Sequence, residues 1–291
     1  MTPEACRVCG GPAEAAGSVH GRLAGRDFTL LRCPACGYGW VADPLEDLGK
    51  VYDMAYYEGR GADPLVDYLT ELREPLKTVR VHEWDGILAA VRAHAPVGPQ
   101  TRWLDFGCGN GGLVRHLDRE VGCDVVGWDE GAIVDLAREQ GIRIVEDAEL
   151  DALGPFDVIT AVEVLEHVPD PAATVRRVRE LLAPGGTFFY TTGNARPFAE
   201  KLSSWSYVIP EIHISFYEPR TMRRLLTDAG LEPVAPRWDG WPEIYRFKIL
   251  KNLRRPRRGA LTDHVPVGLL ARGFDRRLAL SAFPPARRAA D

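Results

Sequence analysis

The chain has 291 residues, of which 45% are hydrophobic and 26% are charged, and its formal net charge is −5. This composition is typical of a globular protein with room for one full domain and a smaller one. Its apolar runs are too short to span a membrane and its N-terminus shows no export signal, so we expect a cytoplasmic protein. The negative charge argues against a nucleic acid as the main partner.

Residues 1–42 carry two C-x2-C pairs, and a glycine follows each pair. The four cysteines are Cys6, Cys9, Cys33 and Cys36. Thiolates at this spacing predict a zinc ribbon, and the Zn²⁺ would be structural because four thiolates leave no open coordination position. Two disulfides or a redox pair are the alternatives, and a reducing cytosol argues against both. We expect Phe28–Cys33 to form a short strand.

Residues 43–98 are expected to form a linker and helices that cover the cofactor site of the main domain. Residues 43–62 are rich in aromatic and acidic side chains, and two helices follow, the first of which is divided or kinked by Pro75. We assign the apolar stripes of both helices to core packing: Leu65, Leu69, Leu72, Leu76 and Val79, then Trp84, Ile87, Leu88 and Val91.

The most informative segment is 102–129, in which an apolar strand ends at Asp105 and a second one ends at Asp129. Between them, a turn with four glycines opens a helix: Gly107, Gly109, Gly111 and Gly112. Glycines let main-chain amides approach a ligand, and an acid at the end of the second strand is placed to accept ribose hydroxyls. The segment therefore predicts a nucleotide site.

Two cofactors fit this turn. Its glycines satisfy G-x-G-x-x-G, the pattern of a dinucleotide site in dehydrogenases. Asp105, however, would lie beside a pyrophosphate and repel it, whereas it suits the ammonium and sulfonium of S-adenosylmethionine. The sequence therefore favours S-adenosylmethionine.

Further motifs follow in order: VED at Val145–Asp147, FDVITAVEVLEHV at Phe156–Val168, and LLAPGG at Leu181–Gly186 before a strand TFFYTT. With them the chain resembles the class I S-adenosylmethionine-dependent methyltransferases over roughly residues 100–240. The resemblance implies a Rossmann-like α/β domain over 99–291. The alternating pattern predicts strands near 102–106, 123–128, 142–146, 156–162 and 186–192, and helices near 110–119, 131–140, 171–183 and 219–229.

The resemblance also assigns cofactor contacts. Asp105 and the amides of Gly107, Cys108 and Gly109 would hold the methionine end of the cofactor, and Asp129 would take the ribose hydroxyls. Trp128 or Glu130 would flank the adenine, Asp147 and Ala148 would contact its amino group and ring edge, and Glu163 would lie close to the sulfonium. We interpret the two remaining cysteines, Cys108 and Cys123, as small buried residues.

Residues 193–218 interrupt the strand–helix alternation and are rich in aromatic side chains. We interpret them as a lid over the substrate, and the alternative is an aromatic filler that joins this segment to the ribbon. A methyl acceptor must lose a proton, and the candidate bases are His167 and His213, followed by Glu211 and Tyr217.

The C-terminal part has a weaker pattern. Leu231–Trp238 is expected to be the sixth strand, and the basic run Lys248–Arg258 a solvated surface. Residues 267–283 allow two interpretations. Either Leu278–Phe283 is the last strand of the sheet, or 267–283 is an amphipathic helix with Val267, Leu270, Phe274 and Leu278 on one face. We expect the final residues, PPARRAAD, to be a frayed tail.

A zinc ribbon followed by the DMAYYEGR linker resembles a bacterial group that includes C-methyltransferases of nucleotide-linked deoxysugars. Those enzymes have a further C-terminal domain that helps hold the sugar nucleotide, and this sequence has no counterpart of it. We therefore expect a biosynthetic methyltransferase with a small-molecule acceptor, at oxygen or carbon. The alternatives are an RNA methyltransferase with a zinc ribbon and a zinc-dependent binding module without catalysis.

Overall fold

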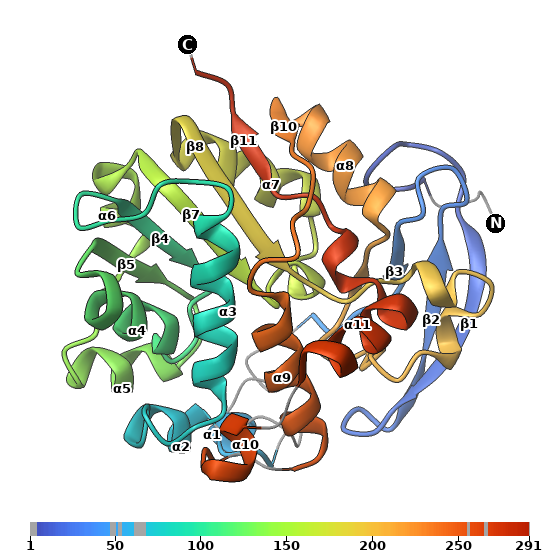
Figure 1. Cartoon of the computed structure of the whole chain (residues 1–291). Coiled ribbons are helices and arrows are strands. Elements are labelled where there is room, and N and C mark those ends of the chain that lie inside the picture. The colour runs from blue at the N-terminus through green and yellow to red at the C-terminus, as the bar shows by residue number, and fades with distance from the viewer. Residues whose placement is uncertain are drawn as a thin grey trace.

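The computed structural model describes residues 5–46, 51, 54–60, 68–254, 257–264 and 267–290. A seven-stranded sheet forms its centre, in the order β10-β11-β8-β7-β4-β5-β6 (Figure 1). Five strands are parallel: β4 (Arg102–Phe106), β5 (Asp124–Trp128), β6 (Ile144–Val145), β7 (Phe156–Val162) and β8 (Leu182–Thr191). The predicted Rossmann-like α/β fold is confirmed, and the predicted strands overlap these five.

Helices cover both faces of this sheet because its strands are apolar on both sides. On one face lie α6 (Asp147–Leu153), α7 (Pro171–Leu181) and α8 (Pro219–Asp228). On the other lie α3 (Arg80–Arg92), α4 (Gly112–Val121), α5 (Ile133–Glu139) and α9 (Trp241–Asn252). Helix α7 begins where the Asp170 carboxylate accepts a hydrogen bond from Ala173 N, with Pro171 as its first residue.

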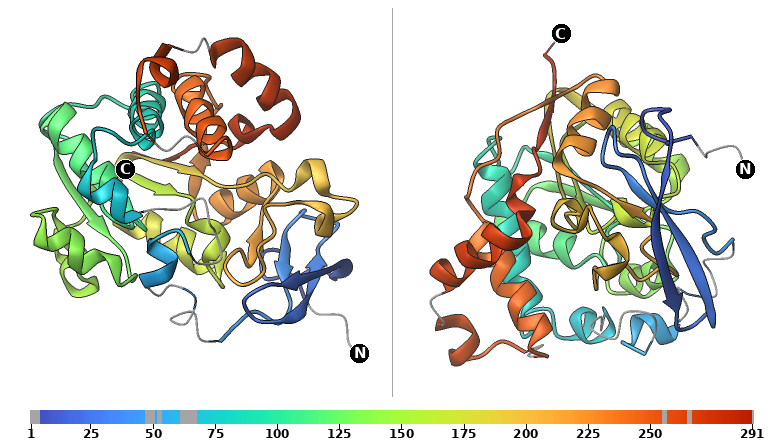
Figure 2. Two further views of the ribbon diagram at one scale, coloured as in Figure 1. Left: turned by 90° about the horizontal axis from the view of Figure 1, so that it is seen from below. Right: turned by 90° about the vertical axis from the view of Figure 1, so that its right-hand side faces the viewer.

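The N-terminal segment forms a second sheet, in the order β1-β2-β3-β9. Its strands are β1 (Glu14–Gly21), β2 (Arg26–Arg32), β3 (Gly39–Val41) and β9 (Ser215–Phe216). Strand β9 belongs to the segment 193–218 and pairs with β3, and both views in Figure 2 show that segment beside the blue strands. Trp205, Val208 and Phe216 share a core with Phe28 and Leu30 of β2. The segment therefore packs on the ribbon, and its role as a lid over the substrate stays a prediction.

The C-terminal predictions need correction. The expected frayed tail contains β11 (Ala286–Arg288), which pairs antiparallel with both β8 and β10 (Leu231–Pro233). Residues 278–283 are not a strand, because α11 (Val267–Leu278) ends there and a 3-10 turn follows. The helical alternative is right for 267–278, but Leu270 and Phe274 are 51% and 43% exposed, and Ala271 is buried instead. A strand of three residues is too short to show periodicity, and backbone pairing places it here.

Short helices precede the main sheet: α1 (Met54–Tyr57) and α2 (Tyr68–Arg73). Leu69 and Leu72 of the first predicted stripe are buried, Leu76 is exposed, and Leu65 lies outside the described residues. All four residues of the second stripe are buried in α3, as predicted. A small helix, α10 (Ala260–His264), lies between α9 and α11. Among the described helices, none is long and apolar enough to cross a membrane.

Candidate functional site

The carboxyl ends of four neighbouring strands place the predicted residues in two groups. The ends of β4 and β5, with Asp105, Asp129 and the turn 107–112, are here called the glycine-turn side. The ends of β7 and β8, with Glu163, Glu166 and the neighbouring segment 207–213, are called the carboxylate side. The two groups are in contact through Val164, which follows Glu163 in the chain. Its side chain packs so closely on Gly107 that a Cβ atom at this glycine would collide with Val164 Cγ2. Gly107 also has a φ of 77°, which favours glycine.

Asp129 organises the glycine-turn side. One carboxylate oxygen accepts a hydrogen bond from Gly109 N at 2.8 Å, and the other accepts one from Gly131 N at 2.7 Å. A Cβ at Gly131 would meet the Tyr57 hydroxyl of α1, so the linker helix lies over this acid. Burial and the charge of Asp129 raise the pKa of Tyr57, which keeps its phenol protonated. Asp129, which is predicted to accept the ribose hydroxyls, thus lies next to two main-chain amides at the carboxyl end of β5, beneath α1.

Asp105 lies beneath the turn and is buried. Its Oδ1 atom accepts a hydrogen bond from Thr160 Oγ1 at 2.8 Å, and the Trp103 indole donates to the same threonine oxygen at 3.0 Å. Burial raises the pKa of Asp105 to about 7, with a smaller contribution from the charge of Asp129, although the Thr160 hydrogen bond opposes this. A cationic group next to this carboxyl would therefore favour its ionised form.

The residues predicted to contact adenine follow β5 and β6. Trp128 is half-buried and packs on Phe106 with ring centroids 4.5 Å apart, and Glu130 is exposed. Asp147 and Ala148 are exposed at the beginning of α6. Cys108, within the turn, is buried, as is Cys123.

Glu163 ends β7 with a φ of 54°, which is uncommon for a residue with a side chain. Its Oε1 atom accepts hydrogen bonds from Lys248 Nζ at 3.0 Å and Thr191 Oγ1 at 2.9 Å. Burial alone would raise the pKa of Glu163, but the adjacent Lys248 ammonium and Thr191 lower it to about 2. The carboxylate side therefore holds one acid whose ionised form is favoured by its neighbours.

Glu166 is a second, fully buried acid that the sequence motif contained but to which we assigned no role. It accepts hydrogen bonds from the Tyr207 hydroxyl and, at 2.8 Å, from Thr192 Oγ1. The Tyr207 hydroxyl also lies 3.2 Å from Glu163. Burial and the charge of Glu163 raise the pKa of Glu166 to about 8. Two neighbouring carboxyl groups thus differ widely in acidity, which is typical of functional sites.

Of the four candidate bases, two lie together. The rings of His167 and His213 are 5.0 Å apart, next to Glu166. The other two candidates hydrogen-bond to backbone groups instead. Glu211 accepts a hydrogen bond from Leu23 N of the ribbon at 2.9 Å, and the Tyr217 hydroxyl donates to Leu165 O at 2.6 Å. Their polar atoms are therefore engaged in holding the segment 193–218 in place.

Sequence reasoning missed Lys248 and Tyr207. Lys248 belongs to the run that we expected to be a solvated surface, but it is only 22% exposed in α9 and forms an ion pair with Glu163. The apolar neighbours of Lys248 in α9, Phe247 and Leu250, are buried as well, and they were the available signal. Tyr207 is one of several aromatic side chains in the segment 193–218, and no sequence pattern distinguishes it from the others.

The four N-terminal cysteines form one cluster, and all six cysteines of the chain are free thiols. Sγ atoms lie 3.5 Å apart in the pairs Cys6–Cys36 and Cys9–Cys33. A tetrahedron with Zn–S bonds of about 2.3 Å has edges of about 3.8 Å, so the cluster fits Zn²⁺. Val8 N donates to Cys6 Sγ at 3.4 Å, as expected for an amide that supports a thiolate.

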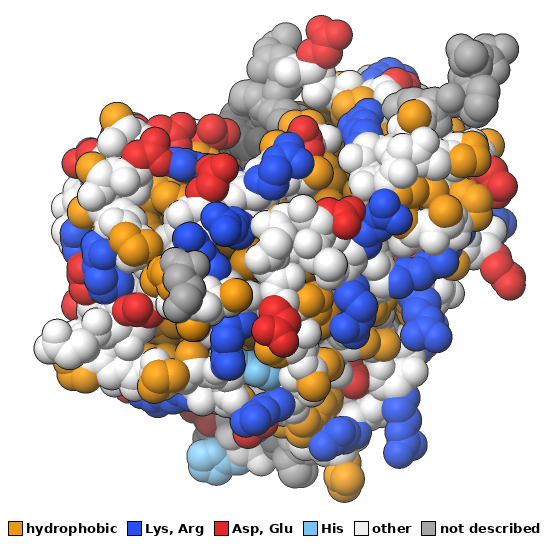
Figure 3. All heavy atoms as spheres, turned by 90° about the horizontal axis from the view of Figure 1, so that it is seen from above, with side chains coloured by type: hydrophobic (Ala, Val, Ile, Leu, Met, Phe, Trp, Pro, Cys, Tyr) orange, Lys and Arg blue, Asp and Glu red, His pale blue; other side chains and the backbone are white. Residues whose placement is uncertain are grey.

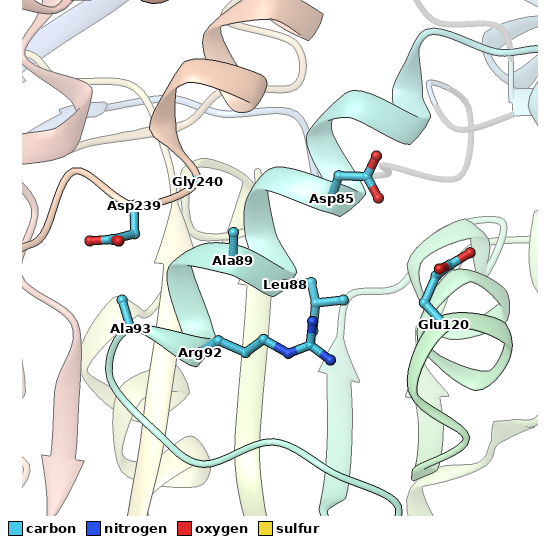
Figure 4. Close-up of a pocket in the computed structure, with 8 residues that line it drawn as sticks. All are labelled: Asp85, Leu88, Ala89, Arg92, Ala93, Glu120, Asp239 and Gly240. Atoms are coloured by element: carbon cyan, nitrogen blue, oxygen red, sulfur yellow. The ribbon is translucent and has the colours of Figure 1, made fainter.

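A hollow of about 550 Å³ opens at the far end of α4 from the glycine turn (Figure 4). It lies between α3, α4 and the residues before α9, and its margin is charged. It is lined by Asp85, Leu88, Ala89, Arg92, Ala93, Glu120, Asp239 and Gly240. None of the predicted site residues lines it.

The family comparison covers more than half of the chain. Residues 80–235 match the sequence profile of the family described as methyltransferase domain. A Bordetella pertussis protein named ubiquinone biosynthesis O-methyltransferase is 34% identical over 155 residues, which are 47% of this chain and 64% of that protein. A Xanthomonas campestris protein of the same name is 40% identical over 116 residues, 36% of this chain and 48% of that protein. The chain thus spans less than two thirds of these relatives.

Two solved structures share the fold at low sequence identity. A chain from the complex between the Haloferax volcanii Trm112 methyltransferase activator and a methyltransferase has a TM-score of 0.52 and 18% identity, covering 82% of this chain and 98% of that chain. Haemonchus contortus phosphoethanolamine N-methyltransferase 2 has a TM-score of 0.50 and 17% identity, covering 85% of this chain and 61% of that chain.

Proposed function

This chain belongs to the methyltransferase domain family, and we propose that it transfers a methyl group from S-adenosylmethionine to an oxygen or carbon of a small molecule. The observation that carries the proposal is the Asp129 carboxylate, which lies against Gly109 N and Gly131 N at the end of β5. An acid in this position accepts ribose hydroxyls in nucleotide folds. Asp105, Gly107, Cys108 and Gly109 would hold the methionine end.

The adenine would lie between the ends of β5 and β6, next to Trp128, Glu130, Asp147 and Ala148. Glu163, which Lys248 keeps ionised, would face the positive sulfonium. The protein's contribution to the transfer would then be alignment and a favourable charge, since the cofactor supplies the activated methyl group.

The acceptor would lie on the carboxylate side. Either His167 or His213 would remove its proton, and the names of the relatives favour a hydroxyl acceptor. The formal net charge of −5 supports a small molecule over a phosphate backbone. Figure 3 looks onto the opposite edge of the main sheet, near the C-terminus, where the basic and acidic side chains of the described residues are both widely spread. The cytoplasm would be the site of the reaction, and Zn²⁺ would bind the four cysteines there as a structural ion.

Calorimetric titration tests the cofactor assignment. We expect S-adenosylmethionine and S-adenosylhomocysteine to bind one per chain, and NAD to bind far more weakly. Transfer of a labelled methyl group to phenols, enols and RNA then tests the acceptor. Stronger binding of NAD, or labelling of RNA alone with a steep salt dependence, would overturn the corresponding part of the proposal.

A further inference from the structure

The cysteine cluster of the ribbon shares a hydrophobic core with the main domain. Three of its four cysteines lie in the same group of buried side chains as Leu165, which follows β7, and Leu225 of α8. Tyr38 and Trp40, which follow the last cysteine, are fully buried in this core and stack with ring centroids 5.3 Å apart. The ribbon therefore packs on the part of the main domain that lies behind the carboxylate side.

The second cysteine pair with its turn, residues 33–38, is here called the second knuckle. Cys33 N donates a hydrogen bond to Tyr38 O at 2.8 Å, which closes this turn. Thr221 Oγ1 of α8 donates one to Cys36 O at 2.7 Å. The position of Tyr38 is thus fixed by the cysteine cluster and by a helix of the main domain.

The 3-10 turn η2 (Leu165–His167) follows β7 and carries Glu166 and His167. Four backbone carbonyls in and directly after this turn accept hydrogen bonds from the ribbon or from residues in and next to β9. The pairs are Tyr217 Oη and Leu165 O at 2.6 Å, Ile214 N and Glu166 O at 2.8 Å, Ser215 Oγ and Val168 O at 2.8 Å, and Arg7 Nη1 and Pro169 O at 3.4 Å. The His167 ring is held as well, since its Nδ1 lies 2.9 Å from Ile212 O.

Tyr38 connects the second knuckle to this turn. Its hydroxyl lies 2.8 Å from Ser215 Oγ, which donates to Val168 O. Because the serine hydroxyl has one hydrogen and the carbonyl accepts it, the Tyr38 hydroxyl is the donor to Ser215. Burial raises the pKa of Tyr38, which keeps this donor protonated. A hydrogen-bonded relay therefore runs from the knuckle to the residue after His167.

We propose that the ribbon positions the acceptor-side groups of the main domain. It acts through three positioning residues, Tyr38, Ser215 and Tyr217, which hold the backbone that carries Glu166 and His167. In-line methyl transfer requires close alignment of the acceptor, so the rate depends on where these two groups are held. This effect on turnover rests on the proposed function.

The proposed cofactor contacts are held by other elements. Asp129 is bonded to Gly109 N and Gly131 N, which belong to the loops after β4 and β5. A disturbance at the second knuckle should therefore change turnover and leave cofactor affinity unchanged. A ribbon that only stabilised the whole protein would affect both.

Two variants that each remove one buried tyrosine hydroxyl give the first test. With a known acceptor, Tyr38→Phe should lower kcat by about 10–100-fold, because a displacement of about 1 Å at the reacting groups has an effect of this size. Its affinity for S-adenosylhomocysteine should stay within about threefold of wild type. Tyr190→Phe is the matched control and should keep full turnover, because the Tyr190 hydroxyl lies in the same core but has no hydrogen-bond partner among the described residues.

Hydrogen exchange measures the link without an acceptor. In Tyr38→Phe the amide of Ile214, which donates to Glu166 O, should exchange about tenfold faster than in wild type, and the amides of residues 107–112 should be unchanged. Ser215→Ala should have the same effect. The double variant should show no larger one, because both substitutions break one relay.

Removal of zinc from the ribbon by a chelator extends the comparison. The treated protein should show fast exchange at Ile214 and normal binding of S-adenosylhomocysteine, and added zinc should restore slow exchange. Wild-type exchange at Ile214, or turnover within threefold of wild type, in folded Tyr38→Phe would overturn the proposal. So would a parallel loss of cofactor affinity, which would indicate general destabilisation. If wild-type protein does not bind S-adenosylhomocysteine, the proposed function fails, and hydrogen exchange still decides whether the ribbon positions the turn.

Discussion

The glycine-turn side and the carboxylate side occupy one edge of one sheet, but they are built differently. The first uses main-chain amides and two acids within 30 residues of sequence, with Asp129 bonded to Gly109 and Gly131. The second uses side chains from three separate segments, in which Glu163 contacts Lys248 and Glu166 contacts Tyr207. The proposed cofactor contacts thus form a local motif, whereas the proposed acceptor contacts combine residues that are distant in sequence.

The largest expected effect is on turnover, and it belongs to the carboxylate side. Once an acceptor is known, His167→Ala and His213→Ala should lower kcat by about 10²–10⁴-fold, because the acceptor loses the group that assists its deprotonation. The affinity for S-adenosylhomocysteine should change less than threefold. Steady-state kinetics with calorimetry measures both. If both variants keep turnover within threefold of wild type, neither histidine assists deprotonation of the acceptor.

The glycine-turn side should show the opposite result. Asp129→Ala should weaken S-adenosylhomocysteine binding by about 10–100-fold, because it removes a charged acceptor of two ribose hydrogen bonds. Asp124→Ala, at the exposed beginning of the same strand, is the matched control and should bind normally. If calorimetry gives equal affinities for the wild type and both variants, Asp129 does not bind the cofactor.

Protonation of Asp105 should couple cofactor binding to pH. Its pKa is raised to about 7 without ligand, and the cofactor ammonium favours the ionised form. The unliganded protein therefore holds a proton below pH 7 that binding must release, so affinity should fall about tenfold between pH 8 and pH 6. Methylthioadenosine, which lacks the ammonium, should bind equally at both values. A pH-independent affinity for S-adenosylmethionine would contradict the coupling.

The smallest expected effect concerns the ion pair that the sequence did not reveal. Lys248→Met leaves the half-buried Glu163 without its cation and should destabilise the protein by about 1–3 kcal/mol. Lys248→Arg keeps the charge and should recover part of that loss. Urea unfolding at pH 7 measures both variants. A Lys248→Met protein as stable as wild type would show that the pair is dispensable for folding.

These contrasts explain what the sequence could predict. The glycine turn with Asp129, and the four cysteines, can be recognised from their local spacing in the sequence. In the structure Asp129 contacts the glycine turn, and the four cysteines form one cluster. Lys248 and Tyr207 reach Glu163 and Glu166 only after α9 and the segment 193–218 pack, which no local period encodes. Strands β9 and β11 are two and three residues long, and they exist because a neighbouring strand offers unpaired amides and carbonyls.

The structure of the protein with bound S-adenosylhomocysteine tests the central claim most directly, because it locates both sides at once. We predict ribose hydroxyls on the Asp129 carboxylate, the amino-acid end over Gly107–Gly109, and the sulfur directed toward Glu163. Homocysteine directed away from β7, or the ligand in the hollow between α3 and α4, would contradict the division of this edge into a cofactor side and an acceptor side.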